Sequence, residues 1–208
     1  PYRAQTTGGS TGKPKLIRFT RPAGESDESL MAWFYMTGMF FGCRQLICGP
    51  MFHSAPASAL ITGLCCGNRI VMPNNFKPAA IERYIKDYEI EWVQMVPTLM
   101  HRMLKLDTFN PEDFKSVKAL SHTGGYCSAE LKRYAQVKAL GAKNVYEIYS
   151  MSEMIGITII RGDEWLEHPG SVGRPFGGCK ISVRAEDGTE LAPGEVGEIF
   201  MTPSGGYL

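Results

Sequence analysis

The chain has 208 residues, of which 44% are apolar and 21% are charged, and its formal net charge is +1. These values are ordinary for a globular chain with one sizeable core, and the near-neutral charge excludes a protein that binds nucleic acid or a membrane surface through an overall basic field. The longest apolar stretches, around residues 31–41 and 55–66, are too short to span a bilayer.

The chain opens Pro-Tyr-Arg-Ala-Gln, which has neither an initiator Met nor the basic and apolar pattern of a signal peptide. The cysteines form no Cys-x-x-Cys pair, and no His lies at metal-ligand spacing from them. These features predict reduced thiols, a cytoplasmic protein, and a natural protein that begins upstream of residue 1. The cysteines in question are Cys43, Cys48, Cys65, Cys66, Cys127 and Cys179.

Strand and helix patterns alternate from residue 2 to about residue 149, with short connections between them. Predicted strands cover residues 2–6, 16–20, 44–48, 69–72, 91–96, 117–122 and 144–149, and predicted helices cover residues 27–41, 55–66, 78–88, 97–106 and 128–140. The helix at 78–88 places Ile81, Tyr84, Ile85 and Tyr88 on one face. This alternation predicts an α/β fold with a mostly parallel sheet flanked by helices.

The last part of the chain has a different pattern. Residues 179–184 and 196–202 flank the turn sequence Glu186-Asp187-Gly188-Thr189, which predicts a β-hairpin region. We therefore interpret the chain as one partial domain, with an α/β part over residues 1–160 and the start of a β-rich part over residues 170–208.

Residues 7–15 read TGGSTGKPK and follow a predicted strand. Glycines let backbone N–H groups turn toward an anion, and the hydroxyls and lysines add donors and charge, so this loop suits a polyphosphate. A flexible polar turn is the alternative that composition leaves open. A Walker-type P-loop does not fit, because three residues separate Gly8 from Gly12 where that motif has four, and Pro14 follows Lys13 where it needs Ser or Thr.

This loop resembles the signature loop of the acyl-adenylate-forming superfamily, which includes acyl-CoA synthetases, firefly luciferase and the adenylation domains of peptide synthetases. The family pattern is Thr-(Ser/Gly)-Gly-(Ser/Thr)-Thr-Gly-x-Pro-Lys, and residues 7–15 fit every fixed position. Leu16 stands where the family often has Gly. The resemblance implies that the loop wraps the β- and γ-phosphates of ATP. The loop residues to which it assigns this contact are Thr7, Gly8, Gly9, Ser10, Thr11, Gly12 and Lys15.

A second matching motif is the run HTGGYCS at residues 122–128, between a predicted strand and a predicted helix. A glycine pair permits close backbone approach to a flat ligand. The resemblance implies that Gly124 and Gly125, with Tyr126 beside them, lie against adenine. A plain strand-to-helix turn is the structural alternative.

A third motif, YSMSE at residues 149–153, is similar to the family's Tyr-Gly-x-Thr-Glu. An aromatic ring can stack on adenine, a hydroxyl can donate to a phosphate, and a carboxylate can hold Mg²⁺. By position, the resemblance implies that Tyr149 stacks on adenine, Ser152 contacts the α-phosphate and Glu153 binds Mg²⁺, with Ser150 and Met151 in the same nucleotide-binding segment. Ser150 replaces the family's Gly, and Ser152 replaces its Thr. Without the family, Glu153 is an ordinary exposed carboxylate.

A softer match is GPMFH at residues 49–53. The resemblance places His53 where the acyl pocket meets the adenylate site, and a structural His is the alternative. Residues 170–175 and 194–199 resemble family segments whose glycines we interpret as structural. We expect one mainly apolar cavity, bordered by His53, Gly124, Gly125, Tyr149 and Met151.

The resemblance covers essentially the whole chain and is closest to bacterial bile-acid–CoA ligases. It implies that several family parts lie outside these residues: the N-terminal portion, the Asp that holds the ribose hydroxyls, the hinge, and the small C-terminal domain with its adenylation Lys. We therefore expect an AMP-forming acid–CoA ligase that uses ATP, Mg²⁺ and CoA. Its expected substrate is a bile acid first, a fatty acid second and an aryl acid third.

The 208-residue chain alone is expected to form no acyl-CoA, because those catalytic parts lie outside it. Two other functions share the motifs: an adenylation domain that loads a carrier protein, and a non-catalytic ATP-binding module. No nucleic-acid partner and no membrane span are expected, and a homo-oligomer stays open.

Overall fold

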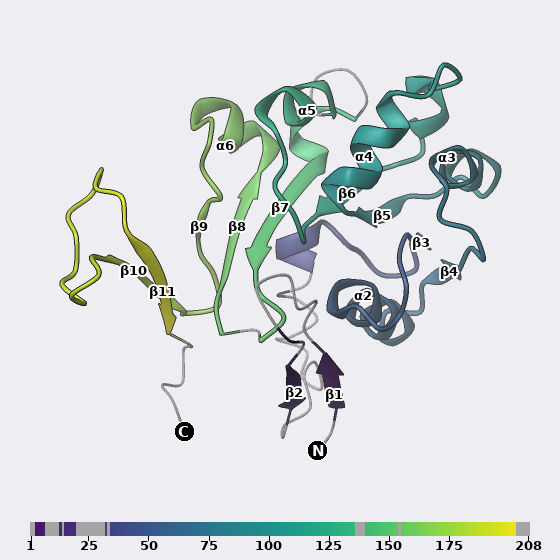
Figure 1. Cartoon of the computed structure of the whole chain (residues 1–208). Coiled ribbons are helices and arrows are strands. Elements are labelled where there is room, and N and C mark those ends of the chain that lie inside the picture. The colour runs from purple at the N-terminus through teal and green to yellow at the C-terminus, as the bar shows by residue number, and fades with distance from the viewer. Residues whose placement is uncertain are drawn as a thin grey trace.

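A computed structural model describes residues 3–6, 13, 15–19, 32, 34–135, 140–153 and 155–202. Within them, a seven-stranded sheet forms the centre of the molecule (Figure 1). Its spatial order is β4 (Arg69–Val71), β3 (Arg44–Ile47), β5 (Trp92–Met95), β6 (Ala119–His122), β7 (Val145–Ser150), β8 (Ile157–Arg161) and β9 (Arg174–Pro175). Strands β4 to β7 pair in parallel, so the predicted α/β fold with a mostly parallel sheet is confirmed.

The parallel strands place their carboxyl ends along one edge of the sheet. In the register of β5 and β6, Gln94 lies opposite Ser121 and Met95 lies opposite His122. Strand β8 then returns antiparallel to β7, and β9 pairs antiparallel with β8. The loops that follow β3, β5, β6 and β7 therefore meet at the same edge, which is where open α/β sheets bind ligands.

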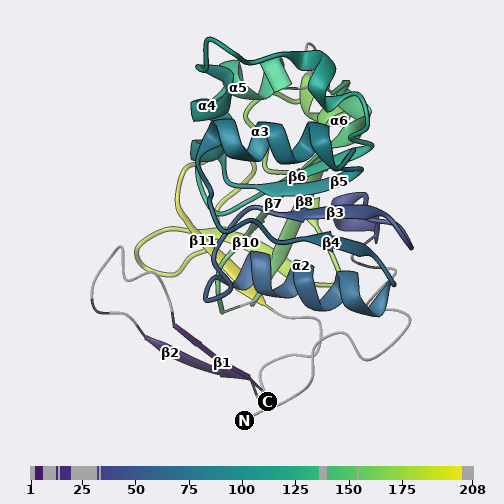
Figure 2. The same ribbon diagram turned by 90° about the vertical axis from the view of Figure 1, so that its right-hand side faces the viewer.

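Helices cover both faces of the sheet (Figure 2). Helix α2 (Ser54–Cys65) lies on one face, and α3 (Pro78–Asp87), α4 (Pro97–Leu104) and α5 (Ala129–Tyr134) lie on the other. A short helix, α6 (Gly162–Glu167), follows β8. Because both faces are covered, every residue of β5 and β6 is buried, and these strands do not show the alternation of a half-exposed sheet.

The core consists of two apolar layers, one on each side of the sheet. Ile81 and Ile85 of α3 are fully buried in the first layer, as the apolar face of this helix predicts. Tyr88, predicted on the same face, follows the end of α3 and is 52% exposed, and its ring stacks on that of Tyr84 with 5.9 Å between the centroids. In the second layer, the indole Nε1 of Trp92 donates to the carbonyl oxygen of Thr37 at 2.9 Å.

The first two strands are not part of the main sheet. Strand β1 (Arg3–Thr6) pairs antiparallel with β2 (Leu16–Phe19), with Thr6 opposite Leu16. The expectation that the parallel sheet begins at residue 2 is therefore wrong. The loop at residues 7–15 is short enough to join an antiparallel pair, whereas a parallel pair needs a crossover connection of about a dozen residues or more.

Helix bounds also differ from the prediction. Of the predicted helix at 27–41, the structure describes residues 32 and 34–37 as helical, and the chain leaves the helix at Gly38. Gly38 has φ +67, and an added Cβ would lie 2.5 Å from Cε2 of Tyr146, so this position requires glycine and ends the helix. Strand β8, helix α6 and strand β9 are not among the predicted elements.

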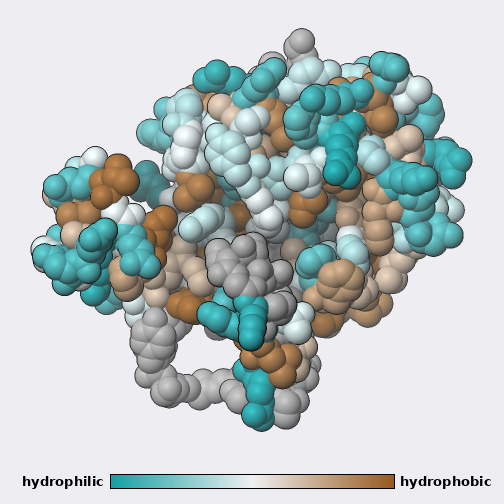
Figure 3. Space-filling view, viewed as in Figure 1, coloured by the Kyte–Doolittle hydropathy of each residue, from teal (hydrophilic) through white to brown (hydrophobic). Residues whose placement is uncertain are grey.

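The predicted hairpin near the end of the chain is confirmed. Strands β10 (Lys180–Arg184) and β11 (Glu198–Thr202) pair antiparallel as a separate sheet. On the face shown in Figure 3, hydrophilic side chains cover much of the outer side of α3 and α4. Among the helices described, none has both the length and the apolar character needed to cross a membrane.

Candidate functional site

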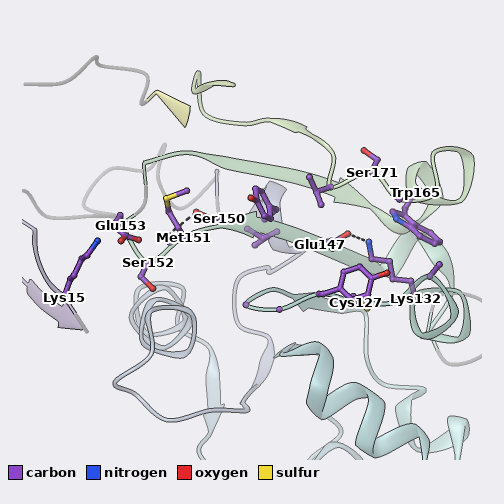
Figure 4. A pocket seen from close by; sticks show the side chains of 18 of the residues that line it. Lys15, Cys127, Lys132, Glu147, Ser150, Met151, Ser152, Glu153, Trp165 and Ser171 are labelled. Carbon is purple, nitrogen blue, oxygen red and sulfur yellow. Dashed lines mark hydrogen bonds and ion pairs between the residues drawn. The ribbon is translucent and has the colours of Figure 1, made fainter. Parts of the chain in front are cut away.

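A cavity of about 850 Å³ opens at the carboxyl edge of the sheet, beside β7 and the loop from β6 to α5. Figure 4 shows Lys15, Ser152 and Glu153 toward one end of it and Lys132 and Trp165 toward the other. We call this space the first cavity. The predicted nucleotide and metal contacts that border it are Lys15, Gly124, Gly125, Tyr126, Tyr149, Ser150, Met151, Ser152 and Glu153.

Positive and negative side chains meet at one end of the first cavity. Lys13 and Lys15, just before β2, border this end, and Figure 4 shows the Lys15 ammonium pointing toward Glu153. Glu153 is exposed, and it has no hydrogen bond or ion pair with the part of the chain that the structure describes. The remaining predicted phosphate contacts lie outside the described residues: Thr7, Gly8, Gly9, Ser10, Thr11 and Gly12.

The glycine pair after β6 gives the first cavity a wall without side chains. Gly124 has φ +81, a conformation that L side chains adopt only with strain. An added Cβ would lie 3.6 Å from Val96 at Gly124 and 3.8 Å from Pro97 at Gly125, which is ordinary contact. The backbone conformation, and not crowding, therefore requires glycine at position 124. The neighbouring Tyr126 is 89% exposed, so its ring is not packed into the core.

The end of β7 places three kinds of side chain at this cavity. Tyr149 is 36% exposed and Met151 is 37% exposed, so both present part of their surface to the space. The hydroxyl of Ser150 donates to the carbonyl oxygen of Gly156 at 2.8 Å, which ties β7 to the start of β8. Ser150 thus borders the cavity while its hydroxyl bonds within the protein. Ser152 is half-buried and makes no such bond to the described residues.

The opposite end of the first cavity holds a buried ion pair. The ammonium of Lys132 pairs with Glu147 and lies 4.7 Å from the ring centroid of Trp165. Burial raises the pKa of Glu147 although the ammonium opposes that shift. Burial and the charge of Lys132 lower the pKa of His122 to about 3, so His122 is neutral at physiological pH. Burial raises the pKa of Cys127 to about 11, which leaves its thiol protonated and unreactive.

A second cavity of about 450 Å³ adjoins the first. It lies between the carboxyl ends of β3 and β5 and the start of α2, where His53 occupies the N-cap position. Gly124 and Ser152 border both cavities, so the two spaces adjoin at these residues, and we call this place the neck. The predicted lining is distributed over these two adjoining cavities: Gly125, Tyr149 and Met151 border the first, His53 borders the second, and Gly124 borders both.

Several wall residues belong to none of the predicted contacts, among them three that are buried and polar or charged. Lys132 and Glu147 border the first cavity, and Gln94 borders the second. A lysine on a short helix and a glutamate on a strand give no sequence signal for burial, because both are usually exposed. Gln94 does have such a sequence signal, because it is the only polar residue in the apolar strand Trp92–Met95. A lone polar residue in a buried parallel strand needs a partner.

The described residues contain no cluster of three or more His, Cys, Asp or Glu side chains that could hold a metal ion. Mg²⁺ does not need such a cluster, because it commonly takes one or two carboxylates and completes its shell with waters and phosphate oxygens. Glu153, exposed at the first cavity and unpaired within the described chain, has the chemistry for such a contact.

Comparison with known proteins gives a family match over nearly the whole chain. The profile of the family described as AMP-binding enzyme matches residues 2–205. The uncharacterized acyl–CoA ligase YhfT of Bacillus subtilis is 29% identical over 97% of this chain and 40% of its own length. The medium/long-chain-fatty-acid–CoA ligase FadD8 of Mycobacterium tuberculosis is 27% identical over 97% of this chain and 35% of its own length. The chain thus spans less than half the length of these two relatives.

A solved structure has the same fold. O-succinylbenzoate coenzyme A synthetase (MenE) of Bacillus subtilis, in complex with ATP and a magnesium ion, superimposes with a TM-score of 0.77 and 25% sequence identity. The alignment covers 98% of this chain and 41% of that one.

Proposed function

The chain belongs to the family of AMP-binding enzymes, and we propose that the protein containing it is an AMP-forming acid–CoA ligase. One observation carries this proposal. Two cavities adjoin at the carboxyl edge of the sheet and share Ser152 and Gly124. A reaction between a nucleotide phosphate and a carboxylate requires two substrates to meet at one point, and the neck between the cavities provides such a point.

We place ATP in the first cavity. Its adenine lies against the backbone of Gly124 and Gly125 and stacks on the ring of Tyr149, which borders the same space. Its phosphates extend toward Lys15 and Glu153, at the end where Figure 4 shows these side chains together. The neck then lies beside the α-phosphate, within reach of the hydroxyl of Ser152.

The proposed reaction has two steps. A carboxylate oxygen attacks the α-phosphorus of ATP, the bond from that phosphorus to the bridging oxygen breaks, and pyrophosphate leaves, giving acyl-AMP. The thiolate of CoA then attacks the acyl carbon, and AMP leaves with the electron pair of the broken carbon–oxygen bond. The first step needs positioning and charge neutralisation and no protein nucleophile. Ser152 donates to an α-phosphate oxygen, and Lys15 reduces the negative charge of the leaving phosphates.

Glu153 is the proposed ligand of Mg²⁺. Glu153 would hold the ion, and the ion would supply positive charge close to the phosphates of ATP. The carboxylate of Glu153 fixes the position of that charge relative to Ser152, one residue earlier in the chain. Removal of the carboxylate is therefore expected to affect the rate of acyl-AMP formation more than the stability of the fold.

We place the acid in the second cavity. Its volume, about 450 Å³, falls in the usual range for small-molecule sites. His53 borders this space, and its ring centroid lies 4.4 Å from that of Phe52, which restricts its orientation. We assign to His53 a contact with the acid near the neck. The candidate acids are, in order, a bile acid, a fatty acid and an aryl acid. Two relatives are named for fatty acids and for O-succinylbenzoate, which supports a carboxylic acid as substrate and does not choose among the three classes.

The test uses the full-length protein with ATP, Mg²⁺, CoA and a panel of bile, fatty and aryl acids, followed by mass spectrometry. We expect acid-dependent release of pyrophosphate and AMP together with an acyl-CoA thioester. Release of ADP and orthophosphate, or ATP binding without any acid-dependent pyrophosphate, contradicts the proposal. A parallel reaction with a phosphopantetheine-bearing carrier protein identifies the acceptor, because a thioester on the carrier and none on CoA would assign the protein to carrier loading.

A further inference from the structure

Gln94 is a buried polar residue in the wall of the second cavity. The residue is 8% exposed and borders this space from strand β5. Its carboxamide oxygen Oε1 is buried and has no hydrogen-bond partner among the residues that the structure describes. Buried amides in folded proteins are almost always paired, so an unpaired one beside a cavity indicates a use for that group.

Gln45 shows that this fold can pair a glutamine at the same depth. It lies on β3, which neighbours β5 in the sheet, and it is fully buried. Its Nε2 donates to the carbonyl oxygen of Ala59 at 2.8 Å, and Nδ2 of Asn68 donates to its Oε1 at 2.9 Å. Gln94 has no counterpart of either bond among the described residues and faces the cavity instead.

The surroundings of Gln94 are mainly apolar, with Ile47, Met95 and Ala59 among the residues that line the same space. The residue in register with Gln94 on β6 is Ser121, whose hydroxyl is also without a partner in the described chain. A plain hydrocarbon would fill this space and leave the carboxamide unpaired. A hydroxyl group suits either end of the carboxamide, because it can accept from Nε2 and donate to Oε1.

We propose that Gln94 is a specificity-determining residue of the second cavity and that it selects an acid whose apolar body carries a hydroxyl group. This inference rests on the proposed function. Gln94 is not among the residues shared with the first cavity, so it contacts the body of the acid and not the carboxylate at the neck. A site built to bond a substrate hydroxyl rejects the analogue that lacks it far more strongly than an apolar pocket rejects an added hydroxyl.

The experiment measures kcat/KM of the full-length enzyme for three pairs of acids that differ in hydroxylation. The pairs are a hydroxylated cholanic acid against cholanic acid, 12-hydroxydodecanoic against dodecanoic acid, and 4-hydroxycinnamic against cinnamic acid. For the wild type we expect the hydroxylated member to be preferred by about tenfold or more in at least one pair. In Gln94→Met, which keeps the length of the side chain and removes its hydrogen-bonding groups, that ratio should fall to about one.

Gln45→Met is the matched control. It removes a buried glutamine whose bonds are internal, so it should lower the melting temperature and leave the ratio of kcat/KM values at the wild-type value. Gln94→Leu provides a second apolar replacement at the test position, should Gln94→Met fail to fold. Because each ratio is measured within one variant, a general loss of folded enzyme does not change it.

Two results overturn the inference. One is a wild type that turns over the acids and prefers no hydroxylated member, and this result needs no variant. The other is a preference that Gln94→Met or Gln94→Leu retains. The failure of the proposed function is distinguishable from both, because then none of the six acids yields pyrophosphate, AMP or a thioester.

Discussion

At the amino ends of the central strands, the buried carboxylate of Glu91 is fully paired, whereas at their carboxyl ends several buried polar atoms are not. Glu91, just before β5, accepts hydrogen bonds from Nζ of Lys118 at 2.6 Å and from the backbone N–H of Arg44 at 3.1 Å. Toward the carboxyl ends, Gln94 lies on β5 and Ser121 lies beside it on β6. Oε1 of Gln94 and Oγ of Ser121 have no partner in the described part of the chain. Oδ1 of Asn68, just before β4, is also buried without a partner in the described chain, so the contrast between the two edges holds for the central strands β5 and β6.

Within this sheet, the paired buried groups contribute to stability, whereas the unpaired ones indicate residues retained for function. An unpaired buried donor or acceptor costs about 1–3 kcal/mol, so it persists in a native structure only where something other than stability retains it. Both cavities lie at the carboxyl edge, beside the unpaired groups. At the amino ends of β5 and β6 the carboxylate of Glu91 is paired instead, and its bonds to Lys118 and Arg44 hold strand ends together. Substitutions at the two edges should accordingly differ in what they change.

The largest effect is expected for Lys132 and Glu147. These two charged groups border the first cavity and yet are paired with each other, so they are an exception to the contrast between the edges. Lys132 is 4% exposed. The variant Lys132→Met leaves the carboxylate of Glu147 buried without its counter-charge, which should cost about 3–5 kcal/mol of unfolding free energy. Urea unfolding of the full-length protein measures this. The double variant Lys132→Met/Glu147→Gln should recover much of the loss, and a single variant as stable as the wild type would show that water reaches the pair freely.

The next effect falls on activity and not on stability. Glu153→Gln keeps the shape of the side chain and removes the charge assigned to Mg²⁺, so pyrophosphate exchange should fall by roughly ten- to a thousand-fold. The melting temperature should not change, because Glu153 is exposed and unpaired within the described chain. Glu186→Gln, at another exposed glutamate in the loop after β10, is the matched control and should leave exchange intact. An unchanged rate for Glu153→Gln at limiting Mg²⁺ would make Glu153 a surface carboxylate.

The parallel sheet and the meeting of two motifs at one cavity could be predicted from the sequence. The parallel sheet followed from the alternation of short apolar strands with helices, and its predicted strands at 91–96 and 117–122 contain the observed β5 and β6. The motifs at 122–128 and 149–153 were expected to approach one ligand, and the structure brings both to the first cavity. Local pattern was sufficient here because both motifs immediately follow or end strands of the sheet.

What the sequence could not predict depends on contacts between distant segments. Nothing local to Lys132 indicates that it pairs with Glu147 on the neighbouring strand β7. The expected lining of one cavity is distributed over two adjoining cavities, and the residues that they share, Gly124 and Ser152, come from two separate loops. The separate pairing of β1 with β2 depends on the loop between them. The roles assigned to His53, Ser152 and Glu153 stay predictions.

A smaller effect is expected at the amino edge, with a defined pH dependence. Burial alone would raise the pKa of Glu91, but hydrogen bonds from Lys118 and Arg44 outweigh it and lower the pKa below its ordinary value of 4.5. Because the folded-state pKa is the lower one, this stabilisation is present above about pH 4.5 and is lost as the pH falls through the folded-state pKa. Glu91→Gln should cost about 1.5–3 kcal/mol at pH 7, and thermal unfolding should show the difference from wild type shrinking below pH 4.5. A difference that persists undiminished at pH 3 would contradict a charge-based contribution.

The smallest effect is expected for Ser121 at the carboxyl edge, where the sign of the change in unfolding free energy is the informative result. Ser121 is fully buried, and its hydroxyl has no partner within the described residues. Ser121→Ala removes one buried polar atom and almost no volume, so it should leave the unfolding free energy unchanged or raise it by up to about 1 kcal/mol. Glu91→Gln, at a buried position of the other edge, should lower the unfolding free energy. Urea unfolding of both variants at pH 7 gives the two signs directly. If Ser121→Ala destabilises the protein by more than about 1 kcal/mol, its hydroxyl has a partner after all, and the two edges do not differ as the comparison requires.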